Sequence, residues 1–405
     1  MTRASVDSSA CWVVVFAGAR DSYQVPVALH QAGLLNTLVT DYYCSLDRRF
    51  AATLCSLLPS SILSKVKRRF HSALPSTLVD SHPSYAIANW LHPDEWTKRV
   101  HLLGHKAGSL AAKERCSIVA YSHVATGAFA RAGSFAKVLM QVQPHPAAVK
   151  KALTSDLLVP EFQDRMGNEL TWPREVFQTF AREPLLANLC VAASNYTRET
   201  LIQNGVESEC VAVIPYGVDV DFFSPGHNDS NKFSVLFVGQ IARQKGVHYL
   251  LEAWRRLNFS DAELRIVTHS PSPRESLSPY ASQQVTFVGA LEWAALRNEY
   301  RSADLLCLPS LSEGFGLVAL EAMSCGTPVL TTSACGASDL IQEARNGFVV
   351  PPADLDALMA RLEWASHNRE TLREMRVAAR TTAEQYPWTR FRNALVKAVQ
   401  SIDIR

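Results

Sequence analysis

The chain has 405 residues, of which 47% are hydrophobic and 19% charged, and its net charge is +2. This length exceeds what one hydrophobic core usually supports, so it predicts two domains of about 200 residues each. The nine cysteines are scattered and never spaced as C-x-x-C, which argues against a disulfide framework and a zinc site. Because several of them lie among apolar residues, we expect reduced, buried thiols and a cytoplasmic protein.

Short apolar segments predict four strands in the first half of the chain, at residues 12–16, 117–121, 137–142 and 189–192. The first of these segments is too short for a signal peptide or a membrane helix. No other stretch approaches the roughly 20 apolar residues that are needed to cross a bilayer. Residues 45–115 have a mostly helical pattern. The sequence therefore predicts a soluble or peripheral protein.

Residues 61–70 combine apolar side chains with a cluster of positive charge, carried by Lys65, Lys67, Arg68 and Arg69. A basic segment of this kind can bind an anionic membrane surface, which would place the protein at the inner face of the membrane. The same pattern also fits a solvated helix face whose apolar residues point inward. Both interpretations stay open.

A turn-rich polar run at residues 216–231 is interpreted as a linker between two domains, at residues 1–215 and 232–385. A final helix over residues 386–405 is expected to pack back on the first domain. Its apolar residues recur at i, i+4 and i+8, which is the spacing of one helix face. They are Phe391, Leu395 and Val399.

The second domain alternates short apolar strands with amphipathic helices, which is typical of a doubly wound parallel sheet. Helices are predicted at residues 247–257 and 293–302, and strands at residues 234–238, 264–267, 285–288, 304–308 and 328–331. The fold class is therefore α/β, with two doubly wound parallel sheets. Ligands of such sheets bind beyond the carboxyl ends of the strands, so the cleft between the domains is the expected active site.

The segment 309–328 follows a predicted strand and opens a helix. Gly314 and Gly316 allow unusual backbone angles and close approach of a ligand, and the start of the helix offers free N–H groups to a phosphate. Glu321 lies in a helix of otherwise apolar or small residues, so its carboxylate needs a partner, and ribose hydroxyls are suitable donors. Glu313, on the loop before the helix, is placed to accept from sugar hydroxyls.

The same segment reads Pro-Ser-x-x-Glu-Gly-Phe-Gly-Leu-x-x-x-Glu-Ala-Met-x-x-Gly-x-Pro-Val, which resembles the retaining glycosyltransferases of family four. Their GT-B fold consists of two Rossmann-like domains that face a central cleft. Further phrases that resemble this family lie at residues 213–219, 237–247, 285–291 and 346–352. The resemblance covers roughly residues 190–390 and extends only loosely to the first half.

The resemblance implies roles for individual residues. Lys245 matches the lysine that binds the diphosphate, Glu313 the acidic residue near the donor sugar, and Glu321 the one that holds the ribose. Where the family usually carries Gly-Arg, this chain has Gly239-Gln240, and Arg243 is close enough in sequence to supply the missing charge. The other residues implied to bind the donor are Gly18, Ala290, Leu291, Gly314, Phe315, Gly316 and Leu317.

In the first half, His145 resembles the histidine near the reaction centre of the family and is predicted to be catalytic. His123 also follows a predicted strand and is a candidate for the acceptor side of the cleft. A structural role is the alternative for both histidines. Residues after the first strand are candidates for the acceptor side of the cleft, and turn residues are the alternative. They are Asp21, Tyr23 and Gln24.

The resemblance implies transfer of a sugar from a nucleotide-sugar donor to a saccharide or lipid-linked saccharide, with retention of configuration, in the synthesis of a bacterial cell-surface polysaccharide or glycolipid. No cofactor, no metal and no nucleic acid are expected. The rival functions are a nucleotide-sugar epimerase on the same fold and a non-catalytic subunit that binds the donor. A nicotinamide dehydrogenase is disfavoured because no G-x-G-x-x-G follows a predicted strand.

Overall fold

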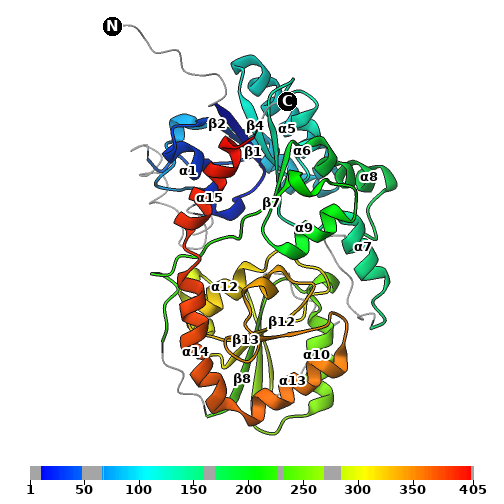
Figure 1. Ribbon diagram of the computed structural model, residues 1–405, viewed down its shortest axis with the longest axis vertical. Coiled ribbons are helices and arrows are strands. Elements are labelled where there is room, and N and C mark those ends of the chain that lie inside the picture. Colours follow the sequence, from blue (N-terminus) through cyan, green and yellow to red (C-terminus); the bar gives the residue numbers. More distant parts are fainter. Residues whose placement is uncertain are drawn as a thin grey trace.

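The computed structural model describes residues 11–47, 66, 68–158, 169–226, 231–268 and 284–402. These residues form two α/β lobes, each built on a parallel sheet with helices on its faces (Figure 1). This confirms the predicted fold class. The described first-lobe helices are α1 (Gln24–Gln31), α4 (Pro83–Leu91), α5 (Trp96–Glu114), α6 (Ala125–Phe129), α7 (Pro146–Thr154), α8 (Arg174–Arg182) and α9 (Asn195–Ile202).

The first sheet has the strand order β3-β2-β1-β4-β5-β6-β7, and all its described pairs are parallel. The interior strand β1 is buried along its whole length because helices cover both faces, which suits its aromatic and β-branched residues. The strands are β1 (Trp12–Phe16), β2 (Leu35–Thr40), β3 (Val79–Ser81), β4 (Ser117–Tyr121), β5 (Lys137–Gln141), β6 (Leu189–Ala192) and β7 (Val211–Val213). The four predicted strands are confirmed, whereas β2, β3 and β7 were not predicted.

The second sheet has the order β10-β9-β8-β11-β12-β13 and is also parallel. Its strands are β8 (Phe233–Val238), β9 (Ala262–Val267), β10 (Val285–Val288), β11 (Leu305–Leu308), β12 (Val329–Thr332) and β13 (Gly347–Val350). Its helices are α10 (Val247–Leu257), α11 (Trp293–Ser302), α12 (Leu317–Ser324), α13 (Leu355–His367) and α14 (Arg369–Glu384). The five strands and both helices predicted here are confirmed, and β13 is additional.

The strand order reverses between β1 and β4 in the first sheet and between β8 and β11 in the second. Such switch points create a crevice at the carboxyl ends of the strands, where parallel sheets bind ligands. The short helix η2 (Arg20–Tyr23) follows β1, and η7 (Arg243–Lys245) follows β8. The loops at both switch points therefore supply candidate site residues.

The last helix, α15 (Trp388–Gln400), leaves the second lobe and lies beside α1 of the first (Figure 1). Phe391, Leu395 and Val399 are buried, as their spacing predicted. Arg392 Nη1 donates to Gln24 Oε1 on α1 at 2.6 Å. The chain thus crosses between the lobes twice, once before β8 and once before α15.

Helix α7 precedes the predicted linker, but its apolar face packs with the other lobe. Val149 and Leu153 are fully buried in the hydrophobic core that covers one face of the second sheet, together with residues of α10 and α13. The predicted domain bounds stay a prediction, and the core of the second lobe includes this helix.

The prediction that all cysteines are unpaired is wrong for two of them. Cys11 and Cys116 form a disulfide. The two residues directly precede β1 and β4, which are neighbours in the sheet with Trp12 opposite Ser117, so the side chains meet across adjacent strands. The cysteine argument for a cytoplasmic location therefore no longer holds, and the location stays a prediction. The other described cysteines, which form no disulfide, are Cys44, Cys190, Cys210, Cys307, Cys325 and Cys335.

The basic cluster is only partly described, because Lys65 and Lys67 lie outside the described residues. Arg69 Nη1 forms an ion pair with Asp41 at 3.1 Å, and Arg68 Nη2 lies 3.8 Å from Glu292 of the second lobe. The arginines are thus engaged within the protein, and membrane contact by this cluster stays a prediction. Within the described part of the chain, no helix has the length and apolar character needed to span a membrane.

Candidate functional site

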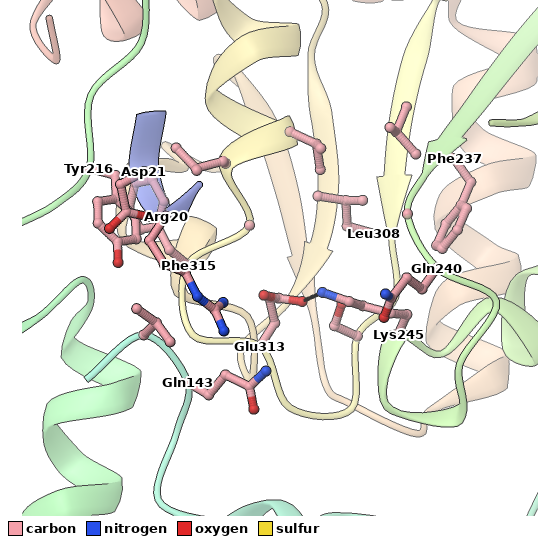
Figure 2. Close-up of a pocket in the computed structure, with 17 residues that line it drawn as sticks. Arg20, Asp21, Gln143, Tyr216, Phe237, Gln240, Lys245, Leu308, Glu313 and Phe315 are labelled. Atoms are coloured by element: carbon pink, nitrogen blue, oxygen red, sulfur yellow. Dashed lines mark hydrogen bonds and ion pairs between the residues drawn. The ribbon is translucent and has the colours of Figure 1, made fainter. Parts of the chain in front are cut away.

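A cavity of about 340 Å³ lies between the two lobes, at the ends of β1, β5, β8 and β11 (Figure 2). Its volume is at the lower end of the range for small-molecule sites. The first lobe and the segment that follows it supply Arg20, Asp21, Val142, Gln143 and Tyr216. The second lobe supplies Phe237, Val238, Gly239, Gln240, Lys245, Leu308, Ser310, Glu313, Phe315, Gly316, Leu317 and Val318.

The loop between β11 and α12 is fixed on both sides by backbone contacts. Glu313 N donates to Ala334 O at 2.8 Å, and Glu313 O accepts from Gly336 N at 3.0 Å. Gly316 caps α12 with a φ of 81°, a left-handed conformation that favours glycine. These contacts fix the backbone of Glu313, a residue that lines the cavity together with Gly316 and Leu317 at the start of α12.

Gly314 lies where this loop meets the first lobe. A Cβ atom there would overlap the carbonyl oxygen of Val142, so only glycine fits. The Gly314 carbonyl accepts from Ser194 Oγ at 2.7 Å and from Thr197 Oγ1 at 3.1 Å, at the start of α9. The predicted donor loop is therefore held by both lobes.

The loop between β8 and α10 packs directly against the first loop. Gln244 O accepts from Leu311 N at 2.8 Å, and Gln244 Nε2 donates to Ser312 O at 2.7 Å. Gly246, with a φ of 65°, has no room for a Cβ atom because the Pro309 carbonyl occupies that space. Two segments that are about 65 residues apart in sequence thus form one surface of the cavity.

This packing joins Lys245 and Glu313 in an ion pair within the cavity (Figure 2). Their side chains are 30% and 16% exposed, so solvent and a ligand can reach both. The sequence assigned the two residues to different parts of one donor, and the structure brings them into contact. An anionic ligand at Lys245 would compete with Glu313 for the ammonium group.

Glu321 does not line the cavity, but it lies one helical turn after Leu317 and Val318, which do. Its Oε2 accepts a hydrogen bond of 2.7 Å from the hydroxyl of Tyr300, a fully buried residue of α11. Burial raises the pKa of the Glu321 carboxyl, although this hydrogen bond opposes the shift. Tyr300 thus orients the Glu321 carboxylate through one of its two oxygens.

Asp21 faces the cavity from a strained turn. Asp21, Ser22 and Tyr23 have consecutive φ values of 46°, 48° and 64°, a left-handed run that costs about 1–3 kcal/mol per residue. Asp21 Oδ2 accepts from the Tyr121 hydroxyl at 2.7 Å, and Tyr216 also hydrogen-bonds this carboxylate. Burial raises the pKa of Asp21, while both tyrosines act in the opposite direction. The turn directs Asp21 toward the cavity and Tyr23 into the core.

Arg243 belongs to the loop between β8 and α10 but does not line the cavity. Its Nε donates to Asp156 Oδ2 at 2.7 Å, just beyond α7, and its Nη2 donates to Asp156 O at 3.1 Å. The Asp156 carboxylate also receives Tyr249 Oη at 2.8 Å and lies 3.2 Å from His248 Nε2. Replacement of the missing arginine by Arg243 stays a prediction, which this arrangement does not support.

Asp156 is expected to be important for stability, because its carboxylate is fully buried among these partners. Asp156→Ala should lower the free energy of unfolding by about 3–5 kcal/mol, since it leaves buried polar partners unpaired. Burial alone would raise the pKa of Asp156, but hydrogen bonds from His248, Arg243 and Tyr249 lower it to about 2. The contribution is therefore present above the ordinary pKa of 3.8 and lost as the pH falls through about 2.

The measurement is denaturant unfolding at neutral pH. The matched control is Glu370→Ala, which breaks an exposed pair with Arg373 and should change stability by less than about 1 kcal/mol. Equal stability of the wild type and the Asp156 variant would contradict this role.

The structure gives His145 a capping position. Its Nδ1 accepts from Ala147 N at 3.2 Å at the start of α7, and its Nε2 lies 2.9 Å from Ala181 O. The side chain is buried, which lowers its pKa. Both ring nitrogens are engaged outside the cavity, so a catalytic role for His145 stays a prediction that this geometry does not support. Gln143, two residues earlier, lines the cavity instead.

His123 lies in an aromatic cluster with Trp96, Trp172 and Phe180, at ring-centroid distances of 5.6, 5.7 and 4.5 Å. Burial lowers its pKa to about 3, so the ring is neutral at physiological pH. Its backbone N–H donates to Glu183 Oε2 at 2.7 Å. Its φ of 78° is strained, but His123 does not line the cavity.

The remaining predicted residues do not line the cavity. Gly18 N donates to Asp41 Oδ1 at 2.9 Å, Tyr23 is buried against Phe16, and Gln24 binds α15. The turn at Ala290 and Leu291 lies near the first lobe, since Arg68 Nη2 donates to Leu291 O at 3.4 Å.

The sequence interpretation missed several residues that line the cavity, above all Arg20, Gln143 and Tyr216. Arg20 directly precedes Asp21, which was a candidate, and Tyr216 lies in a phrase that already resembled the family. Their side-chain types and positions beside predicted site residues were the available signals.

Similarity to known proteins in sequence lies mainly in the second lobe. Residues 219–382 match the family model described as Glycosyl transferases group 1. Two similar curated proteins are the sulfoquinovosyl transferase of Arabidopsis thaliana, 31% identical over 195 residues, and the D-inositol 3-phosphate glycosyltransferase of Gordonia bronchialis, 32% identical over 249 residues. The matches cover 44% and 55% of this chain but only 38% and 54% of those proteins.

Solved structures match nearly the whole chain. Sucrose-phosphate synthase from Thermosynechococcus elongatus superposes with a TM-score of 0.67 at 18% identity, covering 96% of this chain and 98% of that one. The Anabaena protein HepE in complex with UDP-glucose gives a TM-score of 0.62 at 17% identity, covering 96% and 99%. At these identities the likeness shows the fold, and this chain has the two-lobed GT-B fold.

Proposed function

We propose that this chain is a retaining glycosyltransferase of family four that uses a nucleotide-sugar donor. The observation that carries the proposal is the Lys245 and Glu313 pair, in a cavity between the lobes and beside the start of α12. The group 1 domain over residues 219–382 supports it, as does the UDP-glucose bound to a structural neighbour.

In the proposed reaction, the bond between the anomeric carbon and the diphosphate oxygen breaks, and an acceptor hydroxyl oxygen bonds to the same face of the sugar. The departing phosphate oxygen takes the proton of that hydroxyl. Lys245 and the first N–H groups of α12 stabilise the negative charge that develops on the diphosphate. Glu313 accepts hydrogen bonds from the sugar, and Glu321 accepts them from the ribose.

The acceptor is proposed to approach from the first lobe, where Asp21 reaches the cavity with Tyr216 beside it. A carboxylate held by two phenol hydroxyls keeps lone pairs for the hydroxyls of a saccharide. We propose a saccharide or a lipid-linked saccharide as acceptor, in cell-surface polysaccharide or glycolipid synthesis at the inner face of the membrane.

The test begins with a thermal-shift panel of UDP-, GDP-, ADP- and dTDP-sugars, because a ligand of the native state raises the unfolding temperature. The donor that stabilises the protein is then incubated with candidate acceptors, with and without EDTA. We expect transfer that survives EDTA and a product whose anomeric configuration, read by NMR, matches that of the donor.

The assay also separates the rival functions. An isomerised nucleotide sugar formed without acceptor would indicate an epimerase. Binding without hydrolysis or transfer would indicate a non-catalytic subunit. An inverted product would overturn the retaining mechanism, and loss of turnover in EDTA would overturn metal independence.

A further inference from the structure

The cations considered so far do not suffice to neutralise the diphosphate of the proposed donor. Lys245 is paired with Glu313, and Gln240 is neutral at the position where the resemblance to family four implies an arginine. Arg243 is directed to Asp156, away from the cavity. A diphosphate leaving group bears at least two negative charges, so a site of this composition needs a further cation.

Arg20 supplies a cation from the opposite lobe. It lines the same cavity as Lys245 and is exposed to solvent. Its guanidinium extends from the first lobe toward the Lys245 and Glu313 pair (Figure 2). Within the described part of the chain, Arg20 has neither a hydrogen bond nor an ion pair, and Lys245 is the other cation lining the cavity.

The carboxylate of Asp21, next to Arg20 in the chain, forms no ion pair with it. Asp21 is hydrogen-bonded by Tyr121 and Tyr216, and the charge of Arg20 acts on Asp21 without a hydrogen bond between them. A planar guanidinium with five N–H donors is suited to bind two phosphate oxygens at once.

We propose that Arg20 is a catalytic residue that binds the donor diphosphate across the cleft and takes over the role of the arginine absent at Gln240. This inference rests on the proposed function. Because Arg20 and Lys245 come from different lobes, a diphosphate bound by both would also hold the lobes together.

The test measures the binding of UDP, GDP and ADP, and of the corresponding nucleosides, by isothermal titration calorimetry without acceptor. Arg20→Ala should weaken binding of the preferred diphosphate about 10- to 150-fold, the range for a charged hydrogen bond, and leave nucleoside binding unchanged. Arg20→Lys should weaken it less. Gln240→Arg, added to Arg20→Ala, should restore most of the affinity and turnover.

Arg131→Ala serves as the control, because Arg131 is exposed on the same lobe and does not line the cavity. If the wild type binds a diphosphate and Arg20→Ala binds it equally well, the role of Arg20 is overturned while the proposed function stands. If only the KM for acceptor changes, Arg20 serves the acceptor and the inference is wrong. If the wild type binds no nucleotide and transfers no sugar, both proposals fail.

Discussion

Lys245→Ala is expected to lower the turnover number for sugar transfer at least about a hundredfold, while leaving the protein folded. In the proposed reaction the ammonium binds the departing diphosphate as it gains negative charge, and removing one such donor from a catalytic site costs about 2.7–4 kcal/mol of transition-state stabilisation. Its ion-pair partner Glu313 remains 16% exposed, so the unpaired carboxylate keeps access to water. Steady-state kinetics with saturating donor and acceptor provides the measurement.

The control is Lys397→Ala, which removes an exposed lysine of α15 outside the cavity lining. It should retain the wild-type turnover number and unfolding temperature. Near-normal turnover in Lys245→Ala would refute the role of this residue in the leaving-group site.

Glu321→Ala is expected to weaken binding of the preferred nucleoside diphosphate by roughly 10- to 150-fold, because hydrogen bonds to a charged group contribute about 1.5–3 kcal/mol each. The carboxylate already has Tyr300 on one oxygen and would accept ribose hydroxyls through the other. Tyr300→Phe keeps the carboxylate but removes its orienting partner, so it should produce a smaller loss. Isothermal titration calorimetry measures both.

A nucleotide without ribose hydroxyls separates this role from a general effect on folding. Wild type and Glu321→Ala should bind the 2′,3′-dideoxy form of the same diphosphate with similar affinity, since the interaction is absent from both complexes. If Glu321→Ala weakened the ribose and dideoxyribose forms equally, Glu321 would not contact the ribose.

Prediction from the sequence succeeded where the local pattern and the tertiary environment agree. The strands β8 to β12 are short apolar runs between polar turns, and most are buried in a parallel sheet. The missed strand β2 begins with the half-buried residues Leu35, Asn36 and Thr37, so it lacks a continuous apolar run. The missed β7 has only three residues. Their strand structure depends on neighbours that are far away in sequence.

The sequence predicted those cavity residues that lie together in one short segment. Glu313 and Gly316 belong to one loop and helix start, and both line the cavity. Arg243, by contrast, was judged by its distance in sequence from Gln240, although the turn at η7 directs its side chain to Asp156. The cation that lines the cavity together with Lys245 is Arg20, more than 200 residues earlier than Arg243.

Structural roles of reactive residues were the least accessible to sequence reasoning. The spacing of Cys11 and Cys116 gave no sign of a bond, because their meeting depends on the placement of β1 beside β4. A histidine such as His145, at the end of a strand and the start of a helix, fits both a cap and a catalyst. Its contacts with Ala147 and Ala181 support the cap, and they could not be read from the sequence.

The packing of α7 has a consequence for dividing this protein into fragments. A fragment that begins at residue 216 would lack Val149 and Leu153, and would leave uncovered the apolar surface that they bury. It would also lack Asp156, the partner of Arg243. We expect such a fragment to aggregate when expressed alone, and extending it to include residues 146–158 through a linker to restore solubility. Equal solubility of both fragments would show that the second lobe folds independently of this helix.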